Sequence, residues 1–505
     1  MSNNKDIVRL TIAVVIASGI LGAGLVVLRM AMSDPRIVNS SVMSQNYPVK
    51  TSNSNVNFGE LDSRTSFGEK ILIEEELAKD REGFKDAKNQ GKEAIARNNY
   101  QEATKYFTQA LKIAPNAPET LIYLNNAKIG DREAYIIAVP VPIVPQRSGN
   151  KHPDKALEML RGFAQAQYEI NKAGGINGKP LKLLIINDDD KAEIAMKIAE
   201  KLVTNKNIIG VMGHRLSEVS LAVAPVYTNA KIVFVTPVST SPALQNEDKS
   251  VNNGKRYVFR TNIDTESAAK KLAYYVLNTL KVKNVAIFYD SQKPQYSQNL
   301  RQEFKSTFET FQGKIVYEAD LSSVSDNFPA ETEIKQATAK GAKAFVLLPN
   351  LNSVENARSI IAATPKNINL IGDISILYTR TTLSVLGEKA EGMVLAVASH
   401  NAKNTKFSNL AKQLWGGDNL ELSWQTVNSY DAAQIFIEAL RRNPQAEAIQ
   451  EEICKEGFEA TDAAGNKLKF DCDASSTPLD REKLVQVSRL ESNPKEFQFK
   501  LLENQ

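Results

Sequence analysis

Residues 169–244 read EINKAGGINGKPLKLLIINDDDKAEIAMKIAEKLVTNKNIIGVMGHRLSEVSLAVAPVYTNAKIVFVTPVSTSPAL. Three apolar runs of strand length lie in this stretch, at 181–187, 208–213 and 231–236, and a fourth precedes it at 134–141. They alternate with segments whose apolar residues recur every three or four positions, which is typical of strand-helix-strand units in a parallel sheet. Ligands bind at the C-terminal ends of such strands, so we expect functional residues at 214–217 and 237–241.

The composition is that of a globular protein with a substantial core. The chain has 505 residues, of which 42% are apolar and 24% are charged, and its formal net charge is +4. Lys and Arg are interspersed with nearly as many Asp and Glu. This balance does not favour a nucleic-acid partner.

The N-terminus carries a long apolar segment. Uncharged residues run from Leu10 to Leu28, with Lys5 and Arg9 before them, and about 20 residues span a bilayer. A cleavable signal has a shorter core and a small-residue cleavage site, so we predict an uncleaved transmembrane signal anchor at 1–32. The preceding positive residues predict a single-pass inner-membrane protein with its bulk in the periplasm. The alternative is cleavage near Ser33 and secretion into the periplasm.

Two segments follow the predicted anchor. Residues 33–70 are rich in Ser, Asn and Val without apolar periodicity, so we predict a flexible linker. Residues 71–131 are predicted to be helical and to contain one tetratricopeptide-like repeat, followed by half of a second. The small and aromatic positions that match the repeat are Gly91, Ala94, Tyr100, Ala103, Phe107, Ala110 and Pro115.

The tetratricopeptide-like segment has two interpretations. It is either a short helical stalk, packed on itself or on the following domain, or a docking surface for a partner chain. Such repeats usually need about three copies to be stable alone, which favours the stalk.

Residues 134–500 resemble a known family. The strings EINKAGGINGKPL, GVMGHRLS, APVYTNAKIVFVTPVSTSPAL and RYVFRT are similar to the branched-chain amino-acid (Leu/Ile/Val-binding) receptors, the type I periplasmic solute-binding proteins of ABC importers. The resemblance implies an α/β receptor over residues 132–505, with two lobes joined by a hinge of three crossover strands. One lobe comprises 132–261 and 399–470, and the other 262–398 and 480–505.

The first lobe contains the best-matched candidate site. Ser217 follows one apolar run and precedes an amphipathic segment, where a serine caps a helix and the first backbone N–H groups can bind a carboxylate. The resemblance implies that Ser217 is a ligand residue, and the alternative is a plain N-cap serine. It also implies that Val238, Ser239 and Thr240 form a second binding segment, in which a carbonyl and a hydroxyl hold an amino acid.

The second lobe matches the family less well. Tyr296 stands where the resemblance implies an aromatic that closes over the ligand, and the alternative is a surface tyrosine. Ile374 occupies the position of a glutamate that pairs with the ligand ammonium, so the neighbouring Asp373 is the candidate for that charge. Otherwise the solute is not a plain α-amino acid, because an unpaired ammonium in a closed cleft is costly. Asp290 is a further carboxylate after a strand, for which a structural role is favoured.

The remaining patterns indicate binding rather than catalysis. Cys454 and Cys472 are the only two cysteines, and in an oxidising compartment they would pair and close a loop worth about 3 kcal/mol. Only three histidines are present, and no nucleophile elbow, phosphate loop or metal-ligand spacing occurs. We therefore expect no enzyme, metal or cofactor.

The predicted function is a membrane-anchored receptor that delivers an amino acid or similar small polar solute to an ABC permease. The alternatives are a ligand sensor, or an assembly protein without transport, that acts through the tetratricopeptide-like segment on a docked membrane partner.

Overall fold

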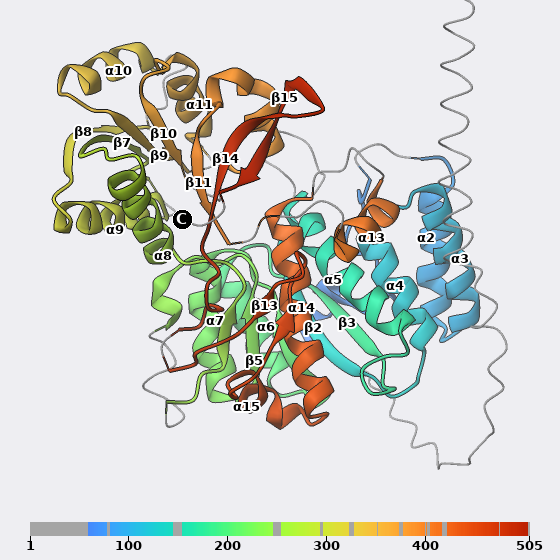
Figure 1. The fold of residues 1–505 in the computed structure, drawn as a ribbon. Coiled ribbons are helices and arrows are strands. Elements are labelled where there is room, and N and C mark those ends of the chain that lie inside the picture. The colour runs from blue at the N-terminus through green and yellow to red at the C-terminus, as the bar shows by residue number, and fades with distance from the viewer. Residues whose placement is uncertain are drawn as a thin grey trace, which may run out of the picture.

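The computed structural model describes residues 59–77, 81–144, 154–245, 254–292, 296–322, 328–350, 352–372, 377–398, 400, 405–416, 422–473 and 475–502. These residues form two α/β lobes, with a pair of helices beside the lower one (Figure 1). The predicted anchor at 1–32 lies outside the described residues. Within the described ranges, no helix has the length and apolar character that a bilayer crossing requires.

Lobe 1 is built on a six-stranded sheet with the order β1-β3-β2-β4-β5-β6. The five strands from β2 to β6 are parallel neighbours, and β1 is antiparallel to β3. The strands are β1 (Thr65–Ser66), β2 (Tyr135–Val141), β3 (Leu181–Asn187), β4 (Ile208–Met212), β5 (Val233–Thr236) and β6 (Val258–Arg260). Four of them coincide with the apolar runs of the sequence, because strands buried on both faces are apolar throughout.

Helices cover both faces of the lobe 1 sheet. Residues of α6 (Ala192–Leu202) and α7 (Ser217–Asn229) share a core with one face. The other face packs against α4 (Pro118–Ile129), α5 (Asp154–Lys172), α13 (Lys406–Trp415), α14 (Trp424–Arg442) and α15 (Ile449–Ile453). Short elements complete the lobe: η3 (Pro242–Gln245), η8 (Ala446–Ala448), β12 (Ala460–Thr461) and β13 (Lys467–Leu468).

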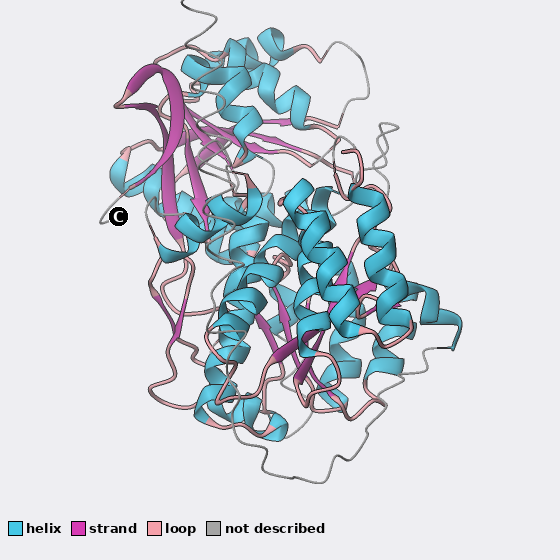
Figure 2. Cartoon of the chain, turned by 90° about the vertical axis from the view of Figure 1, so that its right-hand side faces the viewer, coloured by secondary structure: helices cyan, strands magenta, loops and turns pink. Residues whose placement is uncertain are grey.

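Lobe 2 is built on a seven-stranded sheet with the order β15-β14-β11-β10-β9-β7-β8. Its strands are β7 (Asn284–Tyr289), β8 (Lys314–Asp320), β9 (Ala344–Leu348), β10 (Asn369–Gly372), β11 (Val394–Val397), β14 (Lys483–Leu490) and β15 (Asn493–Leu501). The antiparallel hairpin of β14 and β15 forms one edge of this sheet (Figure 2). The helical elements are α8 (Thr265–Tyr274), η5 (Tyr275–Thr279), α9 (Tyr296–Thr310), α10 (Ala330–Ala339), α11 (Val354–Ala363), η6 (Thr382–Leu386) and η7 (Gly387–Ala390).

The chain crosses between the lobes three times, after β6, after β11 and before β14. Arg481, on the third crossover, is buried and donates to the Thr261 carbonyl of the first crossover at 3.1 Å. It also forms ion pairs with Asp431 of α14 and with Asp462. The predicted two-lobed α/β fold is confirmed, and Arg481 ties two of its crossovers to lobe 1.

The end of the predicted linker is part of the lobe 1 fold. Residues 59–64 form a 3-10 helix, η2 (Gly59–Arg64), and Thr65 and Ser66 pair with Ile186 and Ile185 of β3. A two-residue strand has no periodicity that a sequence pattern could reveal. The expectation of a flexible linker is therefore wrong for residues 59–70, and its remaining part, 33–58, lies outside the described residues.

The helical segment begins with α2 (Phe84–Ala96) and α3 (Tyr100–Ile113), a pair in close contact. Gly91 allows this contact, because a Cβ there would lie 2.6 Å from the Phe107 ring. The third helix, α4, packs on lobe 1. Its Asn126 donates to the carbonyls of Phe67 and Leu183. The segment is thus attached to the lobe as a packed unit, and its likeness to a tetratricopeptide repeat stays a prediction.

A buried ion cluster fixes this attachment. Lys88 of α2 lies 2.7 Å from Glu76 and 2.5 Å from Glu119 of α4, and all three side chains are at most 3% exposed. Glu119 also accepts the N–H groups of Leu72 and Ile73, and Glu76 accepts the Thr120 N–H. The cluster therefore joins α2, α4 and the irregular segment 72–76 that precedes them, with its charges paired as burial requires.

Candidate ligand-binding site

The two candidate loops of lobe 1 meet at the C-terminal rim of its sheet. Ser217 begins α7, and its Oγ accepts a hydrogen bond from the Thr240 N–H at 3.2 Å and another from the Ser239 hydroxyl at 3.1 Å. Ser217 is half-buried, whereas Ser239 and Thr240 are buried. The structure thus brings together three residues that the sequence singled out, with Thr240 contributing its backbone N–H.

Ser217 does not cap α7 as the sequence suggested. The N-cap residue is Leu216, and no side chain caps the helix. The Ser217 hydroxyl is instead engaged by the second loop. The uncapped first turn keeps N–H groups that have no intrahelical acceptor, and an anion can bind such groups.

A buried network holds the first loop in place. His214 has a φ of 49°, and its Nδ1 lies 2.8 Å from the Asp188 carboxylate while its Nε2 lies 3.1 Å from the Tyr227 hydroxyl. All three side chains are fully buried. Gly213 is required by close packing, because a Cβ there would lie 2.2 Å from the Pro140 carbonyl oxygen. Sequence patterns missed this network, since Asp188 and His214 follow different strands and Tyr227 lies in α7.

Asp190, two residues after Asp188, pairs with the loop that contains His214. Arg215 donates to Asp190 through Nε at 2.8 Å, and burial raises the pKa of the Asp190 carboxyl even though Arg215 opposes the shift. No group of three or more potential metal ligands occurs among the described residues. Asp188 and Asp190 thus brace the loop, whereas Asp189 pairs with Arg64 of η2.

The second loop is braced by the first crossover. The carbonyl of Val238, a residue of the predicted binding segment, accepts a hydrogen bond from the Asn262 side chain at 3.0 Å. The Thr240 carbonyl accepts the Thr265 N–H at 3.0 Å. The loop is therefore fixed by the first crossover and by the start of α8 in lobe 2.

The lobe 2 candidates are less well defined. Tyr296 begins α9, is half-buried and packs against the lobe 2 core. Asp373 lies outside the described residues, as does Ile374. Asp290 is 1% exposed, and its Oδ1 accepts the Gln292 N–H at 2.7 Å, which favours the structural role. No described contact joins these residues to Ser217 or Thr240.

Tyr378 is an interlobe residue that the sequence did not indicate. Its side chain packs against the cores of both lobes, and its ring lies 4.5 Å from that of Phe499. Its hydroxyl lies 2.8 Å from Nδ1 of His400, which follows β11 on the second crossover. A lone tyrosine after an apolar strand carries no pattern from which this position could be predicted.

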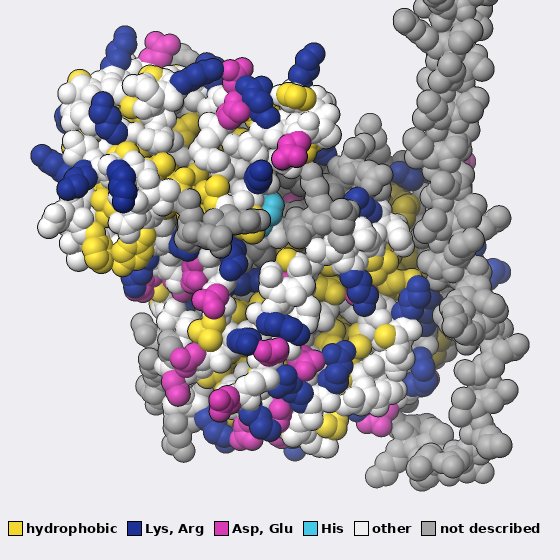
Figure 3. All heavy atoms as spheres, in the orientation of Figure 1, with side chains coloured by type: hydrophobic (Ala, Val, Ile, Leu, Met, Phe, Trp, Pro, Cys, Tyr) yellow, Lys and Arg dark blue, Asp and Glu magenta, His cyan; other side chains and the backbone are white. Residues whose placement is uncertain are grey.

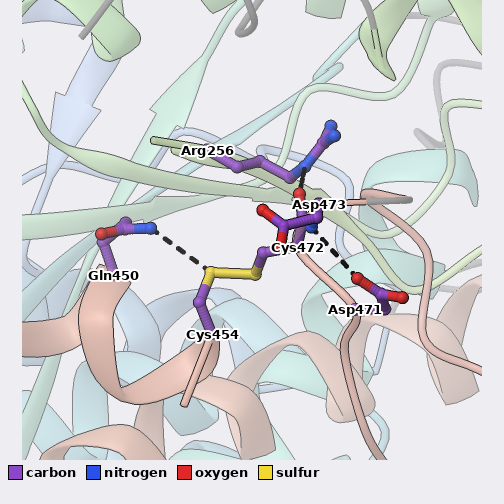
Figure 4. Close-up of a disulfide and its surroundings, with 6 residues drawn as sticks. All are labelled: Arg256, Gln450, Cys454, Asp471, Cys472 and Asp473. Carbon is purple, nitrogen blue, oxygen red and sulfur yellow. Dashed lines mark hydrogen bonds between the residues drawn. A yellow bond between two sulfur atoms is a disulfide. The ribbon is translucent and has the colours of Figure 1, made fainter. Parts of the chain in front are cut away.

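The two cysteines lie in the terminal part of lobe 1. Cys454 and Cys472 are joined in a disulfide, with Cα atoms 5.5 Å apart. The Gln450 side chain donates to Cys454 Sγ, and Arg256 donates to the Cys472 carbonyl at 3.0 Å (Figure 4). The bond therefore links the end of α15 to the loop that returns toward lobe 2.

Two α/β lobes, three crossovers and polar loops at one sheet rim define a hinged binding protein. Residues 139–477 match the periplasmic binding protein family, so the chain belongs to that family. Its members are solute-binding proteins and not enzymes. The family predicted from the sequence is confirmed.

Relatives are named for amino-acid binding. An amino acid binding protein of Pseudomonas aeruginosa is 30% identical over 181 residues, which are 36% of this chain and 46% of that protein. The match thus spans less than half of that relative. A Leu/Ile/Val-binding protein of Rhizobium johnstonii is 27% identical over 312 residues, 61% of this chain and 81% of that protein.

Solved structures share the fold. A substrate-binding protein of an ABC transporter from Desulfitobacterium hafniense, in complex with Leu, has a TM-score of 0.57 at 20% identity and covers 73% of this chain and 100% of its own. A solute-binding protein from Rhodopseudomonas palustris, in complex with 3,4-dihydroxybenzoic acid, has a TM-score of 0.57 at 18% identity, with coverage of 73% and 96%.

Proposed function

We propose that this chain is the solute receptor of an ABC importer and binds a small carboxylate-bearing solute, an amino acid or a related compound, between its lobes. One observation carries the proposal: Ser217, Ser239 and Thr240 form a hydrogen-bonded cluster at the rim of the lobe 1 sheet. Polar groups from two loops converge there, at the place where open α/β sheets bind ligands.

The cluster has the donors that a carboxylate needs. The Ser217 Oγ accepts two hydrogen bonds and retains its own proton for donation. The Thr240 hydroxyl and the N–H groups of the uncapped first turn of α7 are further donors. The helix dipole adds to the attraction for negative charge.

The names of similar proteins support the solute class. The Pseudomonas and Rhizobium relatives are named for amino acids, and the two solved structures hold Leu and 3,4-dihydroxybenzoic acid. These ligands share a carboxylate but not an ammonium group. A carboxylate is therefore the group that we assign to Ser217 and Thr240.

A thermal-shift screen of the full-length protein in detergent tests the proposal. The panel contains branched-chain, polar and acidic amino acids, short amides and plain carboxylates. A ligand at a hundredfold excess over Kd stabilises the native state by about 2.7 kcal/mol, so a hit should raise the melting temperature. Ser217→Ala with Thr240→Ala should abolish the shift, because each charged hydrogen bond contributes about 1.5–3 kcal/mol.

Ser220→Ala is the matched control. Ser220 lies on the same helix and is fully buried, and its hydroxyl has no hydrogen-bond partner, so the ligand shift should persist in this variant. A folded protein that responds to no member of the panel would refute the receptor function. A hit that survives the double substitution would refute the assigned site alone.

We further propose an extracytoplasmic location with residues 1–32 as the anchor. Family membership supports the location, and a disulfide suits an oxidising compartment. The charges on the visible face of both lobes are interspersed (Figure 3), which fits a receptor for a small solute. The membrane partner would be an ABC permease.

A ligand sensor that acts through the helical segment is the second candidate. A cavity of about 990 Å³ between this segment and lobe 1 supports it. Its lining includes Phe67, Tyr100, Tyr135 and Lys182, and Tyr135 begins β2, so the cavity lies at the end of the sheet opposite to the ligand loops. A photo-crosslinker at Tyr100 should capture a partner other than a permease if this candidate is correct.

A further inference from the structure

Arg260 is a buried arginine without an ion pair. It ends β6, and its side chain is fully buried. Nε donates to the Ser476 hydroxyl at 3.1 Å and Nη1 to the Ser241 carbonyl at 2.9 Å, whereas Nη2 has no partner. In the described part of the chain, no carboxylate forms a salt bridge with this guanidinium.

The positive charge persists at neutral pH. Burial lowers the pKa of Arg260 to about 10, and Asp264 only partly opposes this shift. Asp264 is committed elsewhere, because its Oδ1 accepts the Ser267 N–H at 2.8 Å and its Oδ2 accepts from Gln245 at 2.9 Å. Buried charges are normally paired, so an unpaired guanidinium would be stabilised by an anion bound nearby.

The proposed carboxylate loop lies directly against this charge. Ser241, whose carbonyl accepts from Arg260, follows Thr240, and Thr240 donates its N–H to Ser217. Thr265, whose N–H contacts the Thr240 carbonyl, has a buried hydroxyl that also lacks a partner. The unpaired Arg260 guanidinium beside this loop therefore favours negative over positive ligand groups.

We propose that Arg260 makes the site selective for net anionic carboxylates, an inference that rests on the proposed function. A carboxylate without an α-ammonium group should therefore bind at least as tightly as the corresponding amino acid. Arg260 is a specificity-determining residue that acts through its field and does not touch the solute. As an order of magnitude, Coulomb's law gives about a thirtyfold effect on affinity for opposite unit charges if they are about 8 Å apart at an effective dielectric constant of about 20.

Calorimetric titration of the full-length protein with matched ligands tests the inference. Each set contains an amino acid, its carboxylate without the amino group and its amide, for example leucine, 4-methylpentanoate and leucinamide. The carboxylate should bind at least as tightly as the amino acid, and the amide should not bind. A tenfold preference for the amino acid would overturn the inference. This comparison uses the unaltered protein, so it does not depend on whether the variants fold.

Variants locate the effect. Arg260→Gln should weaken carboxylate binding about thirtyfold, and Arg260→Lys should retain most of the affinity because it retains the charge. Lys255→Gln is the matched control, since it removes one positive charge from an exposed lysine that is paired with Glu451, and it should change affinity by less than about threefold. Unchanged binding by a folded Arg260→Gln protein would also overturn the inference.

The outcomes separate this inference from the function on which it rests. If amino acids bind through Ser217 with a preference for the zwitterion, only the role of Arg260 fails. If no amino acid and no carboxylate binds, the receptor function fails, and the inference fails with it.

Discussion

Replacement of Lys88 by Met should detach the helical segment from lobe 1. Lys88 forms buried ion pairs with both Glu76 and Glu119. Removal of one partner from a buried ion pair costs about 3–5 kcal/mol, because the remaining charge is left without compensation. Here two carboxylates would face each other. Lys85→Met, an exposed change on the same helix, should alter the unfolding free energy by less than about 0.5 kcal/mol.

Tryptophan fluorescence during urea unfolding measures the effect. Both tryptophans of the chain, Trp415 and Trp424, belong to the core cluster that also contains α2, α3 and α4 residues, so their emission reports on lobe 1. With a slope of about 1–3 kcal/mol per molar urea, the midpoint should fall by about 1 M or more. A fall no greater than that of the Lys85 control would refute the view that this cluster attaches the segment.

The pH dependence gives a second check on the same variant. Burial raises the pKa of Glu119 above its ordinary value, although Lys88 opposes the shift. A carboxyl whose folded pKa is raised favours folding below its unfolded pKa, and this contribution is lost as the pH rises through the folded value. Without Lys88 the pKa of Glu119 should rise further, because the cation that favours the charged carboxylate is gone. The loss of unfolding free energy in the variant should therefore be smallest near pH 4 to 5, where the carboxyl is protonated. An equal loss at pH 5 and pH 8 would contradict this cause.

Three further predictions use independent features. A non-reduced digest should contain the Cys454 and Cys472 peptides linked, and two free thiols in freshly isolated protein would exclude the native bond. The protein should stay in the membrane fraction after alkaline washing, whereas a soluble form that begins near Ser33 would replace the anchor with a cleaved signal. Gly162→Ala should destabilise lobe 1 by about 1–3 kcal/mol, because its Cβ would lie 2.2 Å from the Thr426 carbonyl oxygen, and an unchanged urea midpoint would contradict this close packing.

Local patterns in the sequence were sufficient for the α/β class and for four strands of lobe 1, whereas the two-lobed architecture was predicted from the family resemblance. The apolar runs at 134–141, 181–187, 208–213 and 231–236 became β2, β3, β4 and β5, because a parallel strand buried on both faces needs apolar residues at nearly every position. The polar loops that follow β4 and β5 then had to lie at one rim. This argument uses only short-range periodicity, which a single sequence carries in full.

Only the tertiary structure decided which groups meet. Ser217 bonds to the Thr240 N–H instead of capping α7, and the Asp188–His214 contact and the unpaired Arg260 arise between separate strand ends. Likewise, β1 pairs with β3 across more than a hundred residues. A hydroxyl, a guanidinium or a two-residue strand has several possible partners of similar energy. The choice among them depends on which segments the packed cores bring within hydrogen-bond distance, and no local pattern encodes that distance.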